Sequence, residues 1–287
     1  MSAPSLDDFA HQQILGFAIE ALRKAGVYGV IPTPLGAVGR AAGITQILDM
    51  SAMPPELAHQ KPDEIDQVLG ALVYHEHLIF IDRTQAPARA RLTHAHEIAH
   101  RILPWHRRAF QFDGTEYLRG ETLNRLEVEA FEAAAHLLFQ GPVFQRLAAQ
   151  RPPSIKSGLA LAAAFGSSRH AALRYYAERH PAPAALLIAG VLPDAGGRVP
   201  IWRSVESEPF RHQFGSLLDR FPTGVLRVGE QEPSVAGRLA RRAMASEEVA
   251  SRFSTIRDLE GVSYRFLTEA FFNHYNLFLM VVGADGR

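Results

Sequence analysis

Apolar residues recur at helical spacing through most of the first half of the chain. From residue 6 to residue 24 they stand two to five positions apart, and Gly26 follows as a stop, so this segment predicts a helix. For a helix over residues 91–103, Thr93 is the expected N-cap and Pro104 the expected end. The same pattern predicts helices over residues 34–42 and 123–138, and a pair of helices on either side of residues 166–168.

Short apolar runs rich in β-branched and aromatic residues predict three hairpins. The first is formed by residues 68–74 and 78–81, around a turn at 75–77. The segment before it, 53–62, contains three prolines and predicts a loop. The other two hairpins are expected at 184–192 with 199–207 and at 262–272 with 277–282, and a charged, alanine-rich helix over 234–253 stands between them.

The predicted elements change from mainly helical to strand-rich at about residues 181–183. We therefore expect an α+β protein with parts at 1–150, 151–181 and 182–287. The helical hairpin at 151–181 has the outline of a helix-turn-helix, but its second helix offers little polar surface, which favours a packed hairpin over a DNA reader. The C-terminal part resembles GAF and PAS sensor domains in architecture. Such a domain predicts a small-molecule ligand, and a docking or dimerisation role is the alternative.

Composition excludes several classes of site and partner. The chain contains no cysteine, which excludes disulfides, thiol nucleophiles and cysteine-ligated metals. Thirty basic residues balance thirty acidic ones, so no overall field favours nucleic acid, and direct DNA binding is not expected. No apolar stretch reaches the ~18 residues that span a bilayer, and the N-terminal segment is polar. A cytoplasmic protein that does not contact a membrane is therefore expected.

Six of the 13 histidines lie within residues 75–106, and one pair has the spacing of a metal site. Residues 96–100 are HEIAH, an HExxH motif. Residues four apart share one face of a helix, so His96 and His100 can bind a single zinc ion. Glu97 is rotated by about 100° from His96, where its carboxylate can take a proton from an activated water.

A catalytic zinc ion needs a third protein ligand and one position left for water. His106 has the spacing of an HExxHxxGxxH motif, but Leu103 stands where that motif needs glycine. His106 is therefore expected in a loop near the site. The other candidates are glutamates of the following helix, as in gluzincins, and they are Glu127, Glu129 and Glu132.

Two segments resemble the ImmA/IrrE family of metallo-endopeptidases. Residues 89–100, RARLTHAHEIAH, are similar to the family pattern R-x-R-F-T-x-A-H-E-L-G-H, and residues 127–138, EVEAFEAAAHLL, to E-x-E-A-N-x-F-A-A-x-L-L-M-P. Together with the upstream helices and hairpin, the resemblance extends over about residues 14–145. The chain departs from these patterns at Leu92 (for Phe), Ala99 (for Gly), Phe131 (for Asn), Ala133 (for Phe) and Gln140 (for Pro).

The resemblance implies a zincin-like, mainly helical peptidase domain with a small β-sheet, and a set of site residues. In this register the third zinc ligand is Glu129, which joins His96 and His100, and Glu97 is the catalytic residue. The implied cofactor is Zn²⁺, with another divalent ion such as Mn²⁺ as the alternative.

The resemblance also implies a biological role. Members of this family act as regulatory proteases that cleave a helix-turn-helix repressor and so derepress stress-response or mobile-element genes. The expected function is therefore zinc-dependent hydrolysis of a peptide bond in such a repressor. The alternative is a non-catalytic, metal-containing transcriptional regulator or protein-binding module that acts by contact. The two hypotheses differ in whether replacing Glu97 by glutamine abolishes the function.

Overall fold

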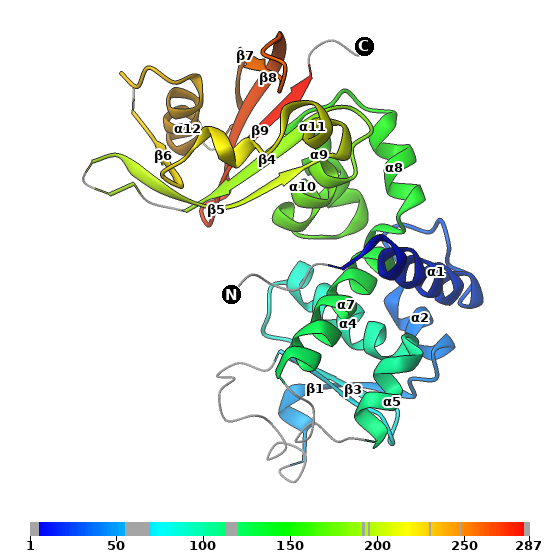
Figure 1. Cartoon of the computed structure of the whole chain (residues 1–287). Coiled ribbons are helices and arrows are strands. Elements are labelled where there is room, and N and C mark those ends of the chain that lie inside the picture. The colour runs from blue at the N-terminus through cyan, green and yellow to red at the C-terminus, as the bar shows by residue number, and fades with distance from the viewer. Residues whose placement is uncertain are drawn as a thin grey trace. The chain divides into compact units, whose positions relative to one another are not determined.

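Contacts within the computed structural model divide the chain into two compact units (Figure 1). Unit 1 comprises Met1–Phe144 and Ala164–Ser167, and unit 2 comprises Gln145–Ala163 and Ser168–Arg287. No helix among the described residues is long and apolar enough to cross a membrane. The structure describes residues 6–54, 69–112, 120–190, 193–194, 196–229, 231–246 and 248–283, without the side chains of 110–112, 120 and 121.

Unit 1 consists of helices around a small sheet. In this sheet β1 (Gln46–Asp49) is parallel to β3 (Leu78–Ile81), and β2 (Gly70–Val73) is antiparallel to β3 on its other side. A short 3-10 helix, Met50–Ala52, follows β1. The helices are α1 (Asp8–Lys24), α2 (Leu35–Ala41), α4 (Pro87–Ile102), α5 (Pro104–Phe112) and α7 (Gly120–Phe139), and α8 (Pro142–Ala149) leads the chain into unit 2.

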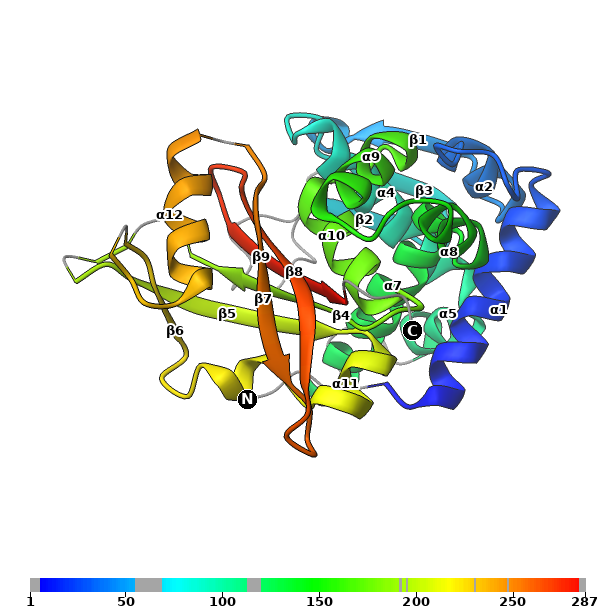
Figure 2. The same ribbon diagram turned by 90° about the horizontal axis from the view of Figure 1, so that it is seen from above.

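Helices α4 and α7 pack against each other, and α1 packs against α7 (Figure 2). Small or aliphatic residues without exposed surface occur on both α4 and α7, among them Ala95 and Ile98 of α4 and Ala130 and Ala134 of α7. Small side chains allow a short distance between helix axes. The packing therefore brings the polar residues of α4 and α7 within reach of each other.

Gln140, which replaces the proline of the family pattern, fixes the end of α7. Its φ of 54° lies in the left-handed region, which proline cannot adopt. The buried side chain donates hydrogen bonds to the carbonyl oxygen of Val30 (2.7 Å) and to Oγ1 of Thr33 (2.9 Å). It also accepts one from the backbone N–H of Gly29 (2.6 Å). The departure from the family pattern thus ties α7 to the loop before α2.

The structure confirms the predicted helices α1, α2 and α7 and the β2–β3 hairpin. The helix expected over residues 91–103 begins earlier, at Pro87, and Thr93 lies inside it, so the prediction of Thr93 as N-cap is wrong. Pro104 ends α4 as predicted but also begins α5, a helix that the sequence pattern did not predict. Strand β1 was likewise not predicted. Most of the predicted loop at 53–62 lies outside the described residues.

The described part of unit 2 contains one antiparallel sheet with strand order β6-β5-β4-β9-β8-β7. The two hairpins predicted in this region are present as β4–β5 and β8–β9. The helix predicted over residues 234–253 ends earlier, and its last residues belong to β7. The strands are β4 (Ala184–Ala189), β5 (Arg198–Glu206), β6 (Val225–Arg227), β7 (Ala250–Arg257), β8 (Ser263–Phe272) and β9 (Leu277–Gly283).

Helices cover both faces of this sheet. Helix α12 contacts β7, β8 and β9, and α10 contacts β4 and β5. On β4, Leu187 belongs to the core beneath α12, whereas Leu186, which points to the opposite face, is also fully buried. The burial of Leu173 and Tyr176 on α10 favours the packed hairpin over a DNA-reading helix. The helices are α9 (Ile155–Phe165), α10 (Arg169–Glu178), α11 (Glu208–Phe214) and α12 (Val235–Ser246), with a 3-10 helix at Leu217–Arg220.

Glu269 on β8 gives a prediction for the pH dependence of folding. Its carboxylate accepts a hydrogen bond from the backbone N–H of Ile155 (2.5 Å). Burial raises the pKa of Glu269 above its ordinary value of 4.5, while the hydrogen bond from Ile155 and the charge of Lys156 act in the opposite direction. The folded protein therefore holds this proton more tightly than the unfolded chain. The resulting stability is present below pH 4.5 and is lost as the pH rises through the folded pKa.

The variant Glu269→Gln, which carries no titrating group, should not show this loss. Its free energy of unfolding, measured by denaturant titration, is expected to rise relative to that of the wild type from acidic to neutral pH. Glu208→Gln, at an exposed position on α11, is the control and should show no such trend. A constant difference between Glu269→Gln and the wild type across the pH range would contradict the prediction.

Candidate metal centre

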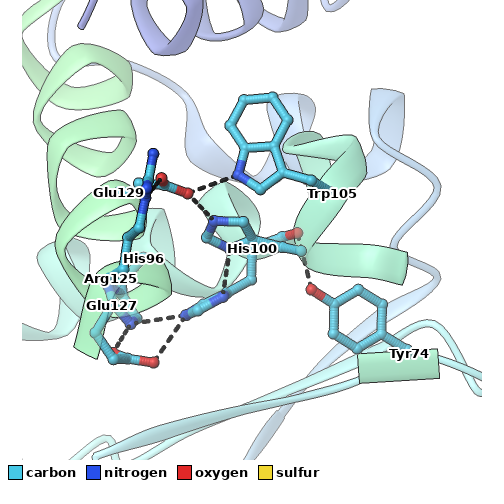
Figure 3. A network of polar contacts seen from close by, with 8 residues as sticks. Tyr74, His96, His100, Trp105, Arg125, Glu127 and Glu129 are labelled. Atoms are coloured by element: carbon cyan, nitrogen blue, oxygen red, sulfur yellow. Dashed lines mark hydrogen bonds and ion pairs between the residues drawn. The ribbon is translucent and has the colours of Figure 1, made fainter. Parts of the chain in front are cut away.

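The two histidines of the HExxH motif converge, as their spacing on a helix predicts. His96 and His100 lie one turn apart on α4, and their Nε2 atoms are 3.1 Å apart (Figure 3). Both side chains are largely buried, with 12% and 6% of their surface exposed. Because Ala95, Ile98 and Ala99 of the same helix are fully buried in the core, α4 is held in place, and the positions of the two nitrogen atoms are fixed.

The third member of this cluster is Glu127 from α7. Its Oε2 lies 3.1 Å from Nε2 of His96, and its Oε1 lies 3.4 Å from Nε2 of His100 (Figure 3). Among the described residues, these three form the cluster of potential ligands whose donor atoms all lie within 4.8 Å of one another. Donors at about 2.0–2.1 Å from a tetrahedral zinc ion are separated by about 3.4 Å. The observed separations therefore suit one ion.

Glu129, the ligand implied by the family resemblance, does not join this cluster. Its Oε2 accepts a hydrogen bond from Nε1 of Trp105 (2.6 Å) and lies 3.1 Å from Nε2 of His106, while its Oε1 accepts one from Nε of Arg125 (3.0 Å) (Figure 3). Residues two positions apart on a helix point about 200° apart. Helix α7 can therefore direct only one of these glutamates at the histidines, and in the structure that residue is Glu127.

His106 is a buried helical residue and not the loop histidine that was expected. It lies on α5 without exposed surface, and its Nδ1 is 2.9 Å from Nδ1 of His100. Burial and the charge of His100 lower the pKa of His106 to about 4, so its imidazole is neutral at neutral pH. His106 thus contacts the outer nitrogen of His100, on the side opposite to Nε2. This position does not match a third ligand of the HExxHxxGxxH type.

Glu97, the predicted catalytic residue, is buried beside strand β2. A Cβ atom placed on Gly70 would lie 2.8 Å from Oε1 of Glu97, so the Glu97 carboxylate uses space that a side chain at position 70 would occupy. Burial raises the pKa of Glu97, and the charge of Glu127 acts in the same direction, while His100 and His96 oppose them. A carboxylate with a raised pKa suits a role in which it takes and returns a proton.

The charges of the cluster stabilise one another. Burial opposes ionisation of Glu127, but its hydrogen bonds with His100 and His96 lower its pKa well below the ordinary value. Burial also opposes the charged form of His96, yet Glu127 and Glu97 raise the pKa of that imidazole. The surroundings thus favour a negative Glu127 carboxylate next to positively charged imidazole. A divalent cation can supply that positive charge in place of the protons.

The donor set fits a divalent cation. Two imidazole nitrogens and one carboxylate are the ligands of catalytic zinc sites that keep a fourth position open, and these donors also suit Mn²⁺. The three potential ligands, His96, His100 and Glu127, come from two packed helices, so the separation of their donor atoms is set by the core and not by a loop.

Tyr74 and Phe131 also shape the site, although the sequence pattern did not connect them with it. The Tyr74 hydroxyl, next to β2, donates to the backbone carbonyl of His100 (2.9 Å) and so fixes the last turn of α4 (Figure 3). The Phe131 ring lies 4.4 Å from that of His96, centroid to centroid, and 51% of this residue is exposed. Phe131 stands four positions after Glu127, on the same face of α7. This spacing is the signal that could have identified Glu127.

Adding a single methyl group at position 70 is expected to displace the Glu97 carboxylate without removing any of the potential metal ligands. In Gly70→Ala the new Cβ would lie 2.8 Å from Oε1 of Glu97 and closer still to Cγ2 of Thr93, so Glu97 must shift. If the site hydrolyses peptide bonds, a displacement of this kind is expected to lower kcat/KM by about 100-fold, measured as the rate of substrate cleavage at equal metal content. Gly16→Ala is the matched control, because a Cβ at Gly16 meets nothing within 4 Å. Full activity of Gly70→Ala would contradict the placement of Glu97.

The comparisons with known proteins agree with a peptidase domain in this region. Residues 54–175 match the sequence model of a peptidase family whose description is "IrrE N-terminal-like domain". A solved structure described as a Mycobacterium tuberculosis transcriptional regulator is similar over 96% of this chain and 79% of its own, with 16% sequence identity and a TM-score of 0.52. At this identity the similarity concerns the fold alone. No curated protein matches the sequence at a significant level.

Proposed function

We propose that this chain, which belongs to the IrrE N-terminal-like peptidase family through residues 54–175, is a zinc-dependent endopeptidase. The observation that carries the proposal is the convergence of His96, His100 and Glu127. Glu97 follows His96 directly in the same motif and is buried. A cation site next to a buried carboxylate is the arrangement that metal-dependent hydrolysis of a peptide bond requires.

The proposed roles follow from the positions of the side chains. His96, His100 and Glu127 would hold the ion, which supplies a Lewis acid that polarises the peptide carbonyl and lowers the pKa of water. Glu97 accepts the proton of the attacking water and returns it to the leaving amine. Because burial raises the pKa of Glu97, this pKa lies closer to neutral pH than that of an exposed glutamate. Both taking up and releasing the proton are then favoured.

Strand β2 is proposed to bind the substrate. Within the described residues β2 pairs with β3 on one side only, so its other edge can pair with an extended peptide. Gly70 of β2 lies against Glu97, so a peptide bound to this edge would lie near the proposed catalytic carboxylate. The exposed ring of Phe131 beside His96 offers an apolar contact for one of the substrate side chains.

The substrate is proposed to be a helix-turn-helix repressor, whose cleavage would derepress stress-response or mobile-element genes. Membership of the IrrE-like peptidase family supports a regulatory protease, and the structural similarity to a protein described as a transcriptional regulator is compatible with such a role. A substrate of this kind is met in the cytoplasm, where we place the protein. In this proposal the chain acts on the repressor and does not itself bind DNA.

Unit 2 is proposed to be a regulatory or docking domain of the GAF or PAS type, with the part at 151–181 as a connector. In the part of unit 2 that the structure describes, one antiparallel sheet with helices packed on it supports this assignment. Exposed aromatic side chains such as Trp202 and Tyr275 are suited to contact a partner, and a small-molecule ligand remains the other proposed input.

The test is to incubate the purified full-length chain with helix-turn-helix proteins encoded beside its gene and, in parallel, with a proteome-derived peptide library. We expect new peptide termini in mass spectra, loss of this cleavage with a chelator, and recovery with added Zn²⁺. Binding to a helix-turn-helix protein with no cleavage in either experiment would contradict the peptidase proposal and support the regulator that acts by contact.

A further inference from the structure

We infer that Glu129 and His106 are positioning residues, which orient the ring of His100 and keep the lone pair of its Nε2 directed at the metal. The inference rests on the metal site of the proposed function and deepens it. Nε2 of His106 lies 3.1 Å from Oε2 of Glu129, and Nδ1 of His106 lies 2.9 Å from Nδ1 of His100. The three side chains thus form a continuous chain that ends at a proposed ligand.

The positions of the protons along this chain follow from the chemistry of its groups. A carboxylate can only accept hydrogen bonds, so His106 must donate from Nε2 to Glu129. A neutral imidazole that carries its proton on Nε2 has a lone pair on Nδ1. Nδ1 of His100 must therefore donate to Nδ1 of His106, and a neutral His100 then has its lone pair on Nε2. This is the tautomer of His100 that can bind a cation through Nε2.

The far end of the chain is held by further donors. The Glu129 carboxylate also accepts hydrogen bonds from Nε1 of Trp105 (2.6 Å) and Nε of Arg125 (3.0 Å). Three donors from two helices therefore fix its orientation, and 4% of Glu129 is exposed. This arrangement explains why a buried glutamate lies two positions after Glu127 without contributing to the ligand cluster.

The two histidine ligands differ in this respect. Nδ1 of His96 is buried and has no hydrogen-bond partner in the part of the chain that the structure describes. Ligating histidines usually bond their outer nitrogen to a carboxylate or carbonyl, and loss of that partner typically lowers metal affinity by about 10–100-fold. Because His96 lacks such a partner, the orientation of the two histidine rings depends on the hydrogen bonds that link His100 to His106 and Glu129.

The inference is tested on the full-length protein by substitutions at His106. His106→Leu removes the acceptor for His100, whereas His106→Asn can place its amide oxygen near the position of Nδ1 and restore it. The matched control is His136→Leu, the same change at another buried histidine of unit 1, whose Nε2 lies 3.1 Å from a glutamate outside the cluster, Glu132. Zn²⁺ affinity is measured by competition with a chromophoric chelator.

We expect His106→Leu to weaken Zn²⁺ binding by about 10–100-fold, His106→Asn to recover most of the affinity, and His136→Leu to leave it unchanged even if its thermal stability falls. Equal affinity of His106→Leu and the wild type would overturn the inference. A failure of His106→Asn to recover affinity, or an equal loss in His136→Leu, would also overturn it, because either result indicates a general packing effect.

A second measurement requires neither metal binding nor a variant. In wild-type protein labelled with ¹⁵N-histidine and treated with chelator, the ring nitrogen shifts should show His100 protonated on Nδ1. An unprotonated Nδ1 of His100 would overturn the inference. This result stays decisive if the wild type binds no Zn²⁺, an outcome that would instead remove the proposed function.

Discussion

Replacing Glu127 by glutamine is expected to abolish tight metal binding and, with it, peptidase activity. Glu127 contacts the Nε2 atoms of both His96 and His100, and its carboxylate supplies the negative charge of the ligand cluster. A neutral amide oxygen is a much weaker ligand for a divalent ion than a carboxylate. The loss of Zn²⁺ affinity should therefore exceed the about 10–100-fold that the outer partner of a ligand contributes, as measured by chelator competition.

Two other substitutions on α7 make this result specific. Glu132→Gln should leave Zn²⁺ affinity unchanged, because Glu132 contacts His11 and His136 and lies outside the cluster. Glu129→Gln should have at most the smaller effect of a positioning residue. The side chain of Glu127 is 48% exposed, so its replacement should not prevent folding, which circular dichroism can verify. The reverse order, with binding lost in Glu129→Gln and kept in Glu127→Gln, would show that Glu129 is the ligand.

The sequence located two of the three clustered residues, His96 and His100. For the third it offered three glutamates of α7, and the family resemblance chose Glu129 among them. His96 and His100 are four residues apart in one helix, so the helix geometry alone places them on the same face. The choice among the glutamates of α7 depends instead on how that helix is rotated about its axis relative to α4. This rotation is set by packing between segments distant in sequence. The family pattern alone led to Glu129, whereas the contact of Phe131 with His96 marks the face of α7 that meets the histidines in the structure.

Prolines explain the errors in the helix boundaries. Pro87, Pro104 and Pro142 each stand at the first position of a helix, α4, α5 and α8 respectively. Proline is favoured there because its φ is already helical and its missing N–H would have no partner in the helix. The sequence pattern predicted Pro104 only as the end of a helix, and it predicted no helix that contains His106. Recognising Pro104 as a start would have predicted α5 and a fixed position for His106.

Strands were predicted correctly where two apolar runs are joined by a recognisable turn. The β4–β5 and β8–β9 hairpins pair segments that are close in sequence, so their signal is local. Strand β1 pairs in parallel with β3, more than 30 residues later, and its four residues carry no pattern of their own. The helix predicted over 234–253 is too long, because its last residues belong to β7. No strong change in composition marks the point where the helix ends and the strand begins.

Replacing Glu97 by glutamine is expected to stop cleavage while the metal remains bound. Glutamine has nearly the same shape but cannot accept the proton of water, and the loss of a general base typically costs about 10²–10⁴-fold in rate. Glu97 is not among the residues whose donor atoms form the ligand cluster, so the metal content per chain should equal that of the wild type. Because burial raises the pKa of Glu97, a neutral residue at this position should not reduce the stability of the fold.

The measurement pairs the rate of substrate cleavage with the metal content of the same sample. Glu76→Gln, at an exposed position in the turn between β2 and β3, is the control and should cleave at the wild-type rate. If Glu97→Gln retained full activity with its metal bound, the proton would have to be taken by another group, and the proposed mechanism would be wrong. If it lost activity together with its metal, Glu97 would instead act in forming the site. Loss of cleavage with the metal retained is the result that separates a catalytic carboxylate from a structural one.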